Sequence, residues 1–312
     1  MDAVRQIANA VLYEGYILWP YRRSALKNQR RFTFGGVYPR THSETHPDDP
    51  WRMRTECLVE GDAPQVDVRV RFLHVVERQI VDAQREPVDE LTIDGERHLS
   101  WQEAVERQID AEGPFSIAAG RAEEALGDGA TIVRSWQPLR GAVEVGAERI
   151  AVGLMRVSVE ILNTTPLEAT GREDALRRTL CSTHTVLHAT GGTFVSLTDP
   201  PAALRDAAEA CRNEGTWPVL VGEPGARDTL LSSPIILDDH PRIAPESPGD
   251  LFDGGEIDAL LTLNILSLTD EEKAEMRDTD PRVREILERT EALSADELLR
   301  PHGAIRDFRV VR

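Results

Sequence analysis

The stretch Val66–Phe72, which reads VDVRVRF, decides the fold class of this chain. Its apolar residues, Val66, Val68, Val70 and Phe72, alternate with charged residues. Successive side chains of a β-strand point to opposite faces of the sheet, so a period of two places all four apolar side chains on one face. The stretch therefore predicts a half-buried strand of an antiparallel sheet.

Outward from this strand, the chain contains many short apolar segments that are separated by turn signals. Asp94-Gly95 within 91–99 predicts a hairpin, Gly191-Gly192 predicts a hairpin between 185–189 and 193–197, and 222–225 predicts a further turn. Regularly spaced short strands are typical of a β-sandwich or a related sheet fold. The remaining strand candidates are 130–136, 141–145, 150–162, 217–221, 233–237 and 260–268.

Helices are predicted at both ends of the chain and at two insertions. Ser100-Trp-Gln-Glu103 matches the Ser-x-x-Glu capping box and predicts a helix over about 100–111. A second inserted helix is expected over 202–212, after two prolines, and a short N-terminal helix over 7–18. Thr269 followed by three acids predicts a capped helix at the start of a helical tail.

These elements predict an α+β fold with a central antiparallel, β-sandwich-like sheet domain. We expect three parts: an N-terminal helix and basic aromatic arm over 1–57, a β-rich core over 58–268, and a C-terminal helical segment over 269–312. A chain of 312 residues is long enough to bury a sizeable core.

Composition excludes several classes of function. The net charge of −18 opposes binding along a nucleic-acid backbone, because phosphate attraction needs a positive protein field. No uncharged apolar segment approaches the ~20 residues that cross a bilayer, and the N-terminus lacks a secretory signal pattern, so we expect a cytoplasmic protein. The three cysteines lack the spacings of zinc or iron–sulfur sites, so we expect free thiols.

Charge is segregated along the chain. Residues 1–57 carry nine basic and six acidic side chains, whereas 58–312 carry 27 basic and 48 acidic ones. An arginine-rich and aromatic segment suits protein contacts, and a stiff acidic loop suits a basic partner surface. The alternative is that the aromatic residues pack on the fold and that water solvates the charges. The candidate partner-binding residues are Arg22, Arg23, Arg30, Arg31, Asp250, Asp253 and Glu256.

The acidic loop over 238–258 also offers ligands for a divalent metal. Seven acids and one arginine fall within it, and three prolines stiffen it. Carboxylate oxygens and an imidazole suit a hard or borderline cation. The alternative is structural, with the acids capping turns or solvated on the surface. The candidate metal ligands are Asp238, Asp239, His240 and Glu246.

Two histidines fall in the sequence Thr-His-Thr-Val-Leu-His over 183–188. Their β-branched neighbours favour a strand, and the Glu of a His-Glu-x-x-His zinc site is missing. We therefore expect His184 to be a hydrogen-bonded structural histidine. Cys181 precedes it by three residues, which raises a Cys–His nucleophile hypothesis, but no motif supplies an orienting group or an oxyanion site.

Several motifs along the chain resemble an uncharacterised protein family encoded beside nickel–iron hydrogenase structural and maturation genes. They are Leu12-Tyr-Glu-Gly-Tyr16, Pro20-Tyr-Arg22, Ala25-Leu-Lys-Asn28, Gly171-Arg-Glu-Asp174, Ser182-Thr-His184, Ser232-Ser-Pro-Ile-Ile-Leu237, Ala244-Pro-Glu-Ser-Pro-Gly-Asp-Leu-Phe-Asp253 and Leu268-Thr-Asp-Glu-Glu-Lys273. The match spans nearly the whole chain, but the family provides no catalytic residues to transfer.

The resemblance implies an accessory role in the assembly, maturation or positioning of a hydrogenase, with a hydrogenase subunit or maturation factor as the partner. Two alternatives come from the residues themselves. One is a metal-dependent enzyme that uses the acidic loop over 238–258, with the ion as a Lewis acid. The other is a small-ligand-binding β-sandwich, which rests on the expected fold alone.

Overall fold

The chain forms two units in the computed structural model. The first comprises Met1–Tyr16 and Arg31–Pro241, and the second comprises Ile17–Arg30 and Arg242–Arg312. The structure describes residues 7–9, 12, 34–110, 112–168, 171–242, 268–279, 284, 287–288 and 290–292. The predicted partner-binding residues Arg22, Arg23, Arg30, Arg31, Asp250, Asp253 and Glu256 lie outside these described residues, as does the candidate metal ligand Glu246.

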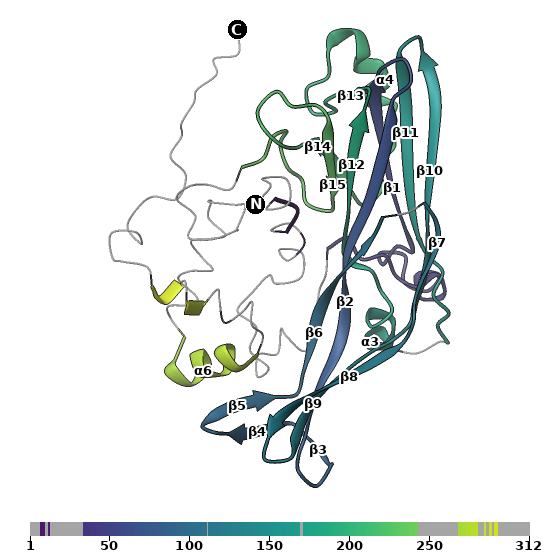
Figure 1. Ribbon diagram of the computed structural model, residues 1–312. Coiled ribbons are helices and arrows are strands. Elements are labelled where there is room, and N and C mark those ends of the chain that lie inside the picture. Colours follow the sequence, from purple (N-terminus) through teal and green to yellow (C-terminus); the bar gives the residue numbers. More distant parts are fainter. Residues whose placement is uncertain are drawn as a thin grey trace. The chain divides into compact units, whose positions relative to one another are not determined.

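The first unit is built from antiparallel sheets arranged as a sandwich, with a few short helices (Figure 1). The α+β prediction is therefore confirmed. In the described part of the chain, one sheet has five strands in the spatial order β13 (Thr193–Phe194), β1 (Arg52–Glu60), β11 (Leu154–Asn163), β10 (Leu139–Ala151) and β7 (Gly113–Ile117).

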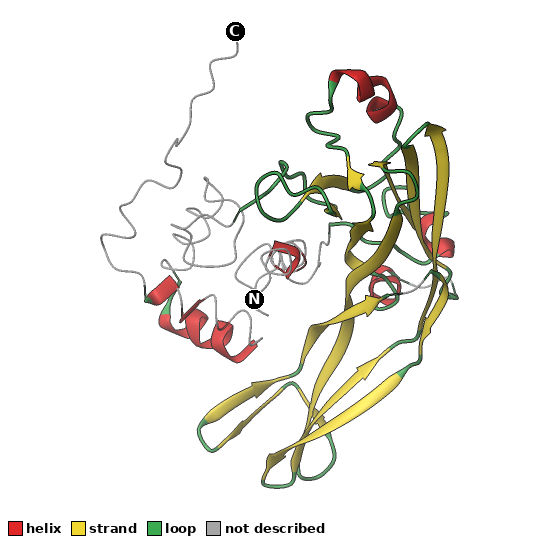
Figure 2. Cartoon of the chain, turned by 45° about the horizontal axis from the view of Figure 1, so that its top comes forward, coloured by secondary structure: helices red, strands yellow, loops and turns green. Residues whose placement is uncertain are grey.

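The second sheet has eight described strands. Its main order is β14 (Trp217–Leu220), β15 (Thr229–Ser233), β12 (Cys181–Thr190), β2 (Gln65–Val81), β9 (Ala130–Trp136) and β8 (Gly120–Gly127). Two further strands, β3 (Pro87–Val88) and β6 (Trp101–Ile109), also pair with β2, and β4 (Glu90–Ile93) forms a separate hairpin with β5 (Glu96–Leu99). Figure 2 shows how strands dominate this unit.

The main core lies between the two sheets. The alternating apolar residues of β2 supply one side of it, as the sequence predicts, because Val70 and Phe72 are fully buried and Val66 and Val68 pack against them. The facing sheet contributes apolar side chains from three strands, β1, β10 and β11. They are Met53, Cys57, Val59, Leu139, Val143, Val157, Val159 and Ile161.

Strand β2 is the spine of the larger sheet. Its first half pairs with β12, its middle with β6 and its end with β9. Residues 70–76 are all buried, so the middle of the strand is covered on both faces, whereas 65–69 are buried on one face only. The polar face of this first segment, with Asp67 and Arg69, therefore remains accessible.

Several predicted strands and turns are confirmed. Strand β9 matches the predicted range 130–136, and Asp94-Gly95 forms the turn between β4 and β5. The turn over 222–225 joins β14 to β15, which pair antiparallel. The strand predicted over 233–237 is wrong in position, because β15 covers Thr229–Ser233 and ends there. The range 260–268 falls outside the described residues except for position 268.

The helix predicted over 100–111 is wrong, because β6 occupies Trp101–Ile109 and pairs with β2 over nine residues. The hydroxyl of Ser100 donates to the carbonyl of Val88 and accepts a hydrogen bond from the amide of Ile80, so it caps no helix. The carboxylate of Glu103 binds Arg134 at 2.8 Å instead of reaching back to Ser100. The side chains of Ser100 and Glu103 therefore form hydrogen bonds and ion pairs within the sheet and do not cap a helix.

The hairpin predicted at Gly191-Gly192 is also wrong, because the chain crosses from one sheet to the other at this point. Strand β13 pairs with β1, and Phe194 is completely buried in the core. Only glycine fits here: a Cβ atom on Gly192 would lie 2.7 Å from the carbonyl oxygen of Glu60, and Gly191 has a φ of +73°. Close backbone approach, and not hairpin geometry, explains these glycines.

The described helices of the first unit are short. They are α2 (Arg40–Ser43), α3 (Arg172–Leu176), η2 (Ala202–Leu204) and α4 (Arg205–Glu209). The last two confirm the insertion predicted over 202–212, although they end earlier. Within the predicted N-terminal helix, residues 7–9 and 12 are helical, and Ile7, Ala8 and Leu12 are buried. Strand β1 runs across position 57, where the first predicted part ends.

In the second unit, α6 (Asp270–Thr279) begins with the predicted cap. The hydroxyl of Thr269 accepts from the amide of Glu272 at 3.2 Å, and the Glu272 carboxylate accepts from the amide of Thr269 at 2.9 Å. Two of its basic residues, Lys273 and Arg277, form ion pairs with Glu291. Further along the predicted helical tail, residues 284, 287–288 and 290–291 are also helical.

Candidate binding groove

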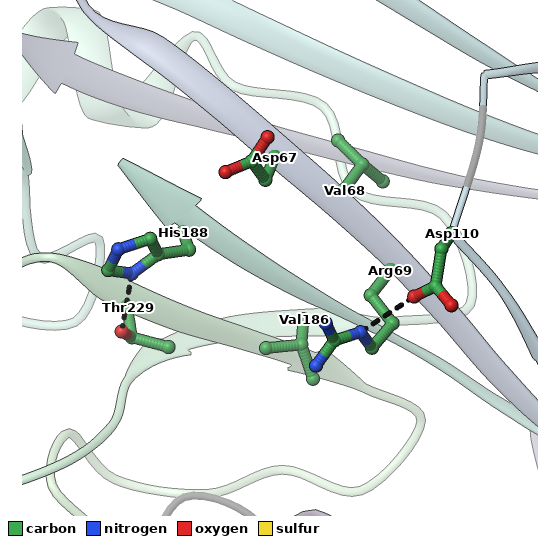
Figure 3. A pocket seen from close by; sticks show the side chains of 7 residues that line it. All are labelled: Asp67, Val68, Arg69, Asp110, Val186, His188 and Thr229. Carbon is green, nitrogen blue, oxygen red and sulfur yellow. Dashed lines mark hydrogen bonds and ion pairs between the residues drawn. The ribbon is translucent and has the colours of Figure 1, made fainter. Parts of the chain in front are cut away.

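An open groove of about 400 Å³ lies on the face of the larger sheet that points away from the core (Figure 3). Strands β2, β12 and β15 supply most of its lining, and one residue follows the end of β6. The lining residues are Asp67, Val68, Arg69, Asp110, Val186, His188 and Thr229.

Strand register explains why distant residues meet in this groove. Asp67 pairs with His188, Arg69 pairs with Val186, and His188 also pairs with Thr229 on its other side. Directly opposed residues of an antiparallel pair point to the same face. Val66, Val70 and Phe72 lie on the core side of β2, and Val68 also packs against the core although it borders the groove, so the intervening charged residues point outward.

The carboxylate of Asp110 accepts hydrogen bonds from two neighbouring side chains. The amide of Gln108 donates to both of its oxygens, at 2.9 and 2.8 Å, and Nε of Arg69 donates at 2.7 Å. The hydrogen bonds from Gln108, followed by that from Arg69, lower the pKa of Asp110. Arg69 and Asp110 therefore neutralise each other at the groove wall.

A hydrogen-bonded chain fixes the imidazole of His188 at the opposite wall. The hydroxyl of Thr229 lies 3.2 Å from Nδ1 of His188 and donates to Asp228 at 3.1 Å. Since that hydroxyl proton goes to Asp228, we assign the ring proton to Nδ1 of His188, which leaves Nε2 as an acceptor. The carboxylate of Asp67, opposite His188, has no hydrogen-bond or ion-pair partner among the described residues.

Beyond the groove, the same polar face becomes buried. Arg71 donates to Glu106 at 2.5 Å and to Asn9 of the N-terminal helical segment at 2.5 Å. Next to it, His184 is completely buried, with Nδ1 3.3 Å from the carbonyl oxygen of Ser182. Burial, followed by the charge of Arg71, lowers the pKa of His184 to about 3. The prediction of a structural histidine on a strand is consistent with this environment.

The Cys–His nucleophile hypothesis finds no support in this geometry. Cys181 and His184 are both 0% exposed, so a substrate cannot reach either residue. The thiol of Cys181 points to the carbonyl oxygen of Thr179, at 3.8 Å, while His184 faces Ser182. A catalytic pair would instead need hydrogen-bond contact between the thiol and the imidazole.

The candidate metal ligand Asp239 serves as a structural bridge. One of its oxygens accepts from the amide of Leu220 at 2.8 Å, and the other accepts from the hydroxyl of Ser196. The next residue, His240, has a φ of +55° and donates its amide to the carbonyl of Leu220 at 2.7 Å. In the part of the chain that the structure describes, no three His, Cys, Asp or Glu side chains gather as a metal site would require. Metal binding by Asp238, Asp239, His240 and Glu246 stays a prediction.

Replacing Asp239 with alanine should destabilise the protein by about 1–3 kcal/mol. The amide of Leu220 would lose a charge-assisted hydrogen bond, and such bonds are worth about 1.5–3 kcal/mol. Urea denaturation measures the change. Asp238→Ala serves as the neighbouring control, and an equal loss in both variants would contradict the bridging role of Asp239.

A second polar cluster, which sequence reasoning missed, lies near α2. The rings of Tyr38, His42 and His46 stack in series, and Nε2 of His42 lies 2.9 Å from a carboxylate oxygen of Asp49. Burial, followed by the charge of Asp49, raises the pKa of Tyr38. Their spacing of four residues was the signal available in the sequence. This cluster anchors the segment before β1.

No protein-family model matches the chain, and no curated protein matches its sequence. Within the described residues, no helix combines the length and the apolar character that crossing a membrane requires. The interpretation of the groove therefore rests on its own geometry.

Proposed function

We propose that this protein is an accessory protein that acts by binding other proteins in the assembly or maturation of a nickel–iron hydrogenase. The observation that carries the binding role is the groove over β2, β12 and β15, an open recess with exposed charged walls. Open polar surfaces of this kind suit protein contacts, because charge complementarity fixes the partner and its orientation.

Binding fits the described side chains better than catalysis does. Cys181 and His184, the residues considered as a catalytic pair, are completely buried. The carboxylate of Asp239 accepts hydrogen bonds from the amide of Leu220 and the hydroxyl of Ser196. Among the described lining residues, the hydroxyl of Thr229 lies near the imidazole of His188, but no described contact gives that imidazole the orienting third group that nucleophilic catalysis requires. The hydrogenase context rests on the sequence motifs that resemble the hydrogenase-linked family.

The test is affinity purification of the tagged full-length chain from its native host. We expect a hydrogenase subunit or maturation factor to co-purify with the wild type. Neutralising the predicted acidic docking residues with Asp250→Asn, Asp253→Asn and Glu256→Gln should reduce that recovery at least tenfold, since a basic partner surface would lose its counter-charges.

A matched control neutralises three exposed acids at two hairpins: Asp94→Asn in the turn between β4 and β5, Glu96→Gln at the start of β5, and Asp128→Asn in the turn between β8 and β9. The control should recover the same partner as the wild type. If no hydrogenase component co-purifies with the wild type, the proposed function is refuted. If the control loses as much partner as the docking variant, general charge and not the acidic loop governs binding.

A further inference from the structure

The groove contains one carboxylate that no described neighbour neutralises. The carboxylate of Asp110 is paired with Arg69 and accepts from Gln108, whereas the carboxylate of Asp67 is exposed and has no hydrogen-bond or ion-pair partner among the described residues. Beside it, with the tautomer assigned above, Nδ1 of His188 donates a hydrogen bond to the hydroxyl of Thr229. The side chains labelled in Figure 3 thus leave a single negative charge, that of Asp67, open to a ligand.

The floor between the charged walls is apolar. Val186 is half-buried and lies opposite Arg69, and Thr229 is also half-buried, so its methyl group adds apolar surface. A ligand side chain that suits this site has an aliphatic stem to cover Val186 and a cationic end to reach Asp67. Of the two long cationic side chains, arginine presents a planar fork that can bind a carboxylate with two hydrogen bonds.

Other ligand classes fit the groove less well. An anion would meet the carboxylates of Asp67, Asp110 and Asp228, on a chain with a net charge of −18. An apolar ligand would bury the charge of Asp67 without a partner, which opposes binding. Charge complementarity therefore selects a cationic side chain.

The groove also suggests the backbone conformation of its ligand. Asp67 and Arg69 are two residues apart on β2, so their side chains repeat along the strand at about 6.6–6.8 Å. An extended peptide repeats its own side chains at the same interval. A segment that lies along β2 can thus place every second side chain into the groove.

We propose that the groove binds an arginine side chain on an extended segment of a partner protein, with Asp67 as the carboxylate that pairs with the guanidinium. This inference rests on the proposed function, because it names the chemistry of the partner. The Arg69–Asp110 pair forms the opposite wall and orients the bound segment along the strand.

The test uses the full-length protein and two blocked peptides, acetyl-Val-Arg-Val-Arg-Val-amide and acetyl-Val-Gln-Val-Gln-Val-amide. Isothermal titration calorimetry should show at least tenfold tighter binding of the arginine peptide, and NMR should show its contact with the imidazole of His188. Asp67→Asn should weaken binding of the arginine peptide at least tenfold. Added salt should weaken it too, because the pair is exposed.

Asp94→Asn is the matched control, because it removes the same charge from the exposed turn between β4 and β5, where Asn-Gly is equally favourable. It should leave peptide binding unchanged. Equal affinity for the two peptides, no detectable binding, or full affinity of Asp67→Asn would overturn the inference. If hydrogenase components still co-purify with Asp67→Asn at the wild-type level, the groove inference fails while the proposed function stands.

Discussion

Acidification from pH 6.5 to pH 4.5 should lower the free energy of unfolding by about 4 kcal/mol, because two histidines are buried as neutral imidazoles. Burial, followed by the charge of Arg71, lowers the pKa of His184 to about 3. Burial, followed by the charge of Arg107, lowers the pKa of His74 to about 4. An unfolded histidine has a pKa of about 6.5, so the unfolded chain takes up protons first as the pH falls.

These pKa values determine the direction of the change in the free energy of unfolding and the pH range over which it occurs. The stabilising contribution is complete above the unfolded pKa of about 6.5 and is lost as the pH falls toward the folded values, at about 1.4 kcal/mol per pH unit for each histidine. Paired carboxylates also have lowered pKa values, as Glu56 does. Burial alone would raise the pKa of Glu56, but hydrogen bonds from Arg54 and from the backbone of Arg212 outweigh burial, so the net shift is downward. Because unfolded carboxyls titrate near 4, the losses above pH 4.5 belong mainly to the histidines.

Urea denaturation at pH 7.0, 6.0, 5.0 and 4.5 measures this dependence. His184→Gln should remove about half of the slope, and His74→Gln a similar share, while His188→Gln is the matched substitution at an exposed position. NMR titration of the wild type gives a second readout, in which the two buried imidazoles do not titrate above pH 5. A slope unchanged in both buried-site variants would contradict this account.

The sequence predicted the core face of the larger sheet because that signal is local. Alternation over Val66–Phe72 identifies both the strand and its buried face. It does not reveal that β2 continues to Val81, because the alternation ends after Phe72, where residues 73–76 are all buried whichever face they occupy. Strand length here depends on pairing with β6 and β9, which are distant in sequence.

The error at 100–111 has the same origin. A local capping motif favours a helix by about 1 kcal/mol, but a nine-residue ladder with β2 and the ion pairs of Glu103 outweigh it. At Gly191-Gly192 the chain bends, as the glycines indicate, but it passes to the other sheet instead of forming the predicted hairpin, because Phe194 is buried between the sheets. Local patterns thus indicated the turn but not its partner strand.

The groove could not be predicted from the sequence, because it too depends on pairing between distant strands. His188 drew attention through its spacing from His184, but the two residues have different environments, one exposed and one completely buried. Asp67 appeared only as the polar complement of a core strand. Its pairing with His188 is a property of the β2–β12 register, which no motif encodes.

Replacing Asn163 with leucine should destabilise the sandwich by about 2–5 kcal/mol. Asn163 ends β11 and is completely buried. Its amide nitrogen donates to the carbonyl of Arg178 at 2.7 Å and to that of Val37 at 2.8 Å, and its oxygen accepts from the amide of Thr165 at 3.0 Å. Leucine keeps the size of the side chain but removes all three bonds.

The cost comes from groups that stay buried without a partner. The carbonyl of Val37 keeps its bond from the amide of Leu180, whereas the described contacts give the carbonyl of Arg178 and the amide of Thr165 no second partner. Each unsatisfied buried group costs about 1–3 kcal/mol. Asn163→Asp should cost at least as much, because it turns an acceptor toward two carbonyl oxygens and buries a charge.

Urea denaturation at pH 7 compares these variants with Gln79→Leu, which makes a matched amide-to-leucine change at an exposed position of β2. That control should shift the free energy of unfolding by less than about 0.5 kcal/mol, because exposed side chains away from special contacts contribute little. A loss below about 1 kcal/mol for Asn163→Leu would mean that water satisfies the orphaned groups. In that case, Asn163 would not be the residue that ties the segments at Val37 and Arg178 to the end of β11.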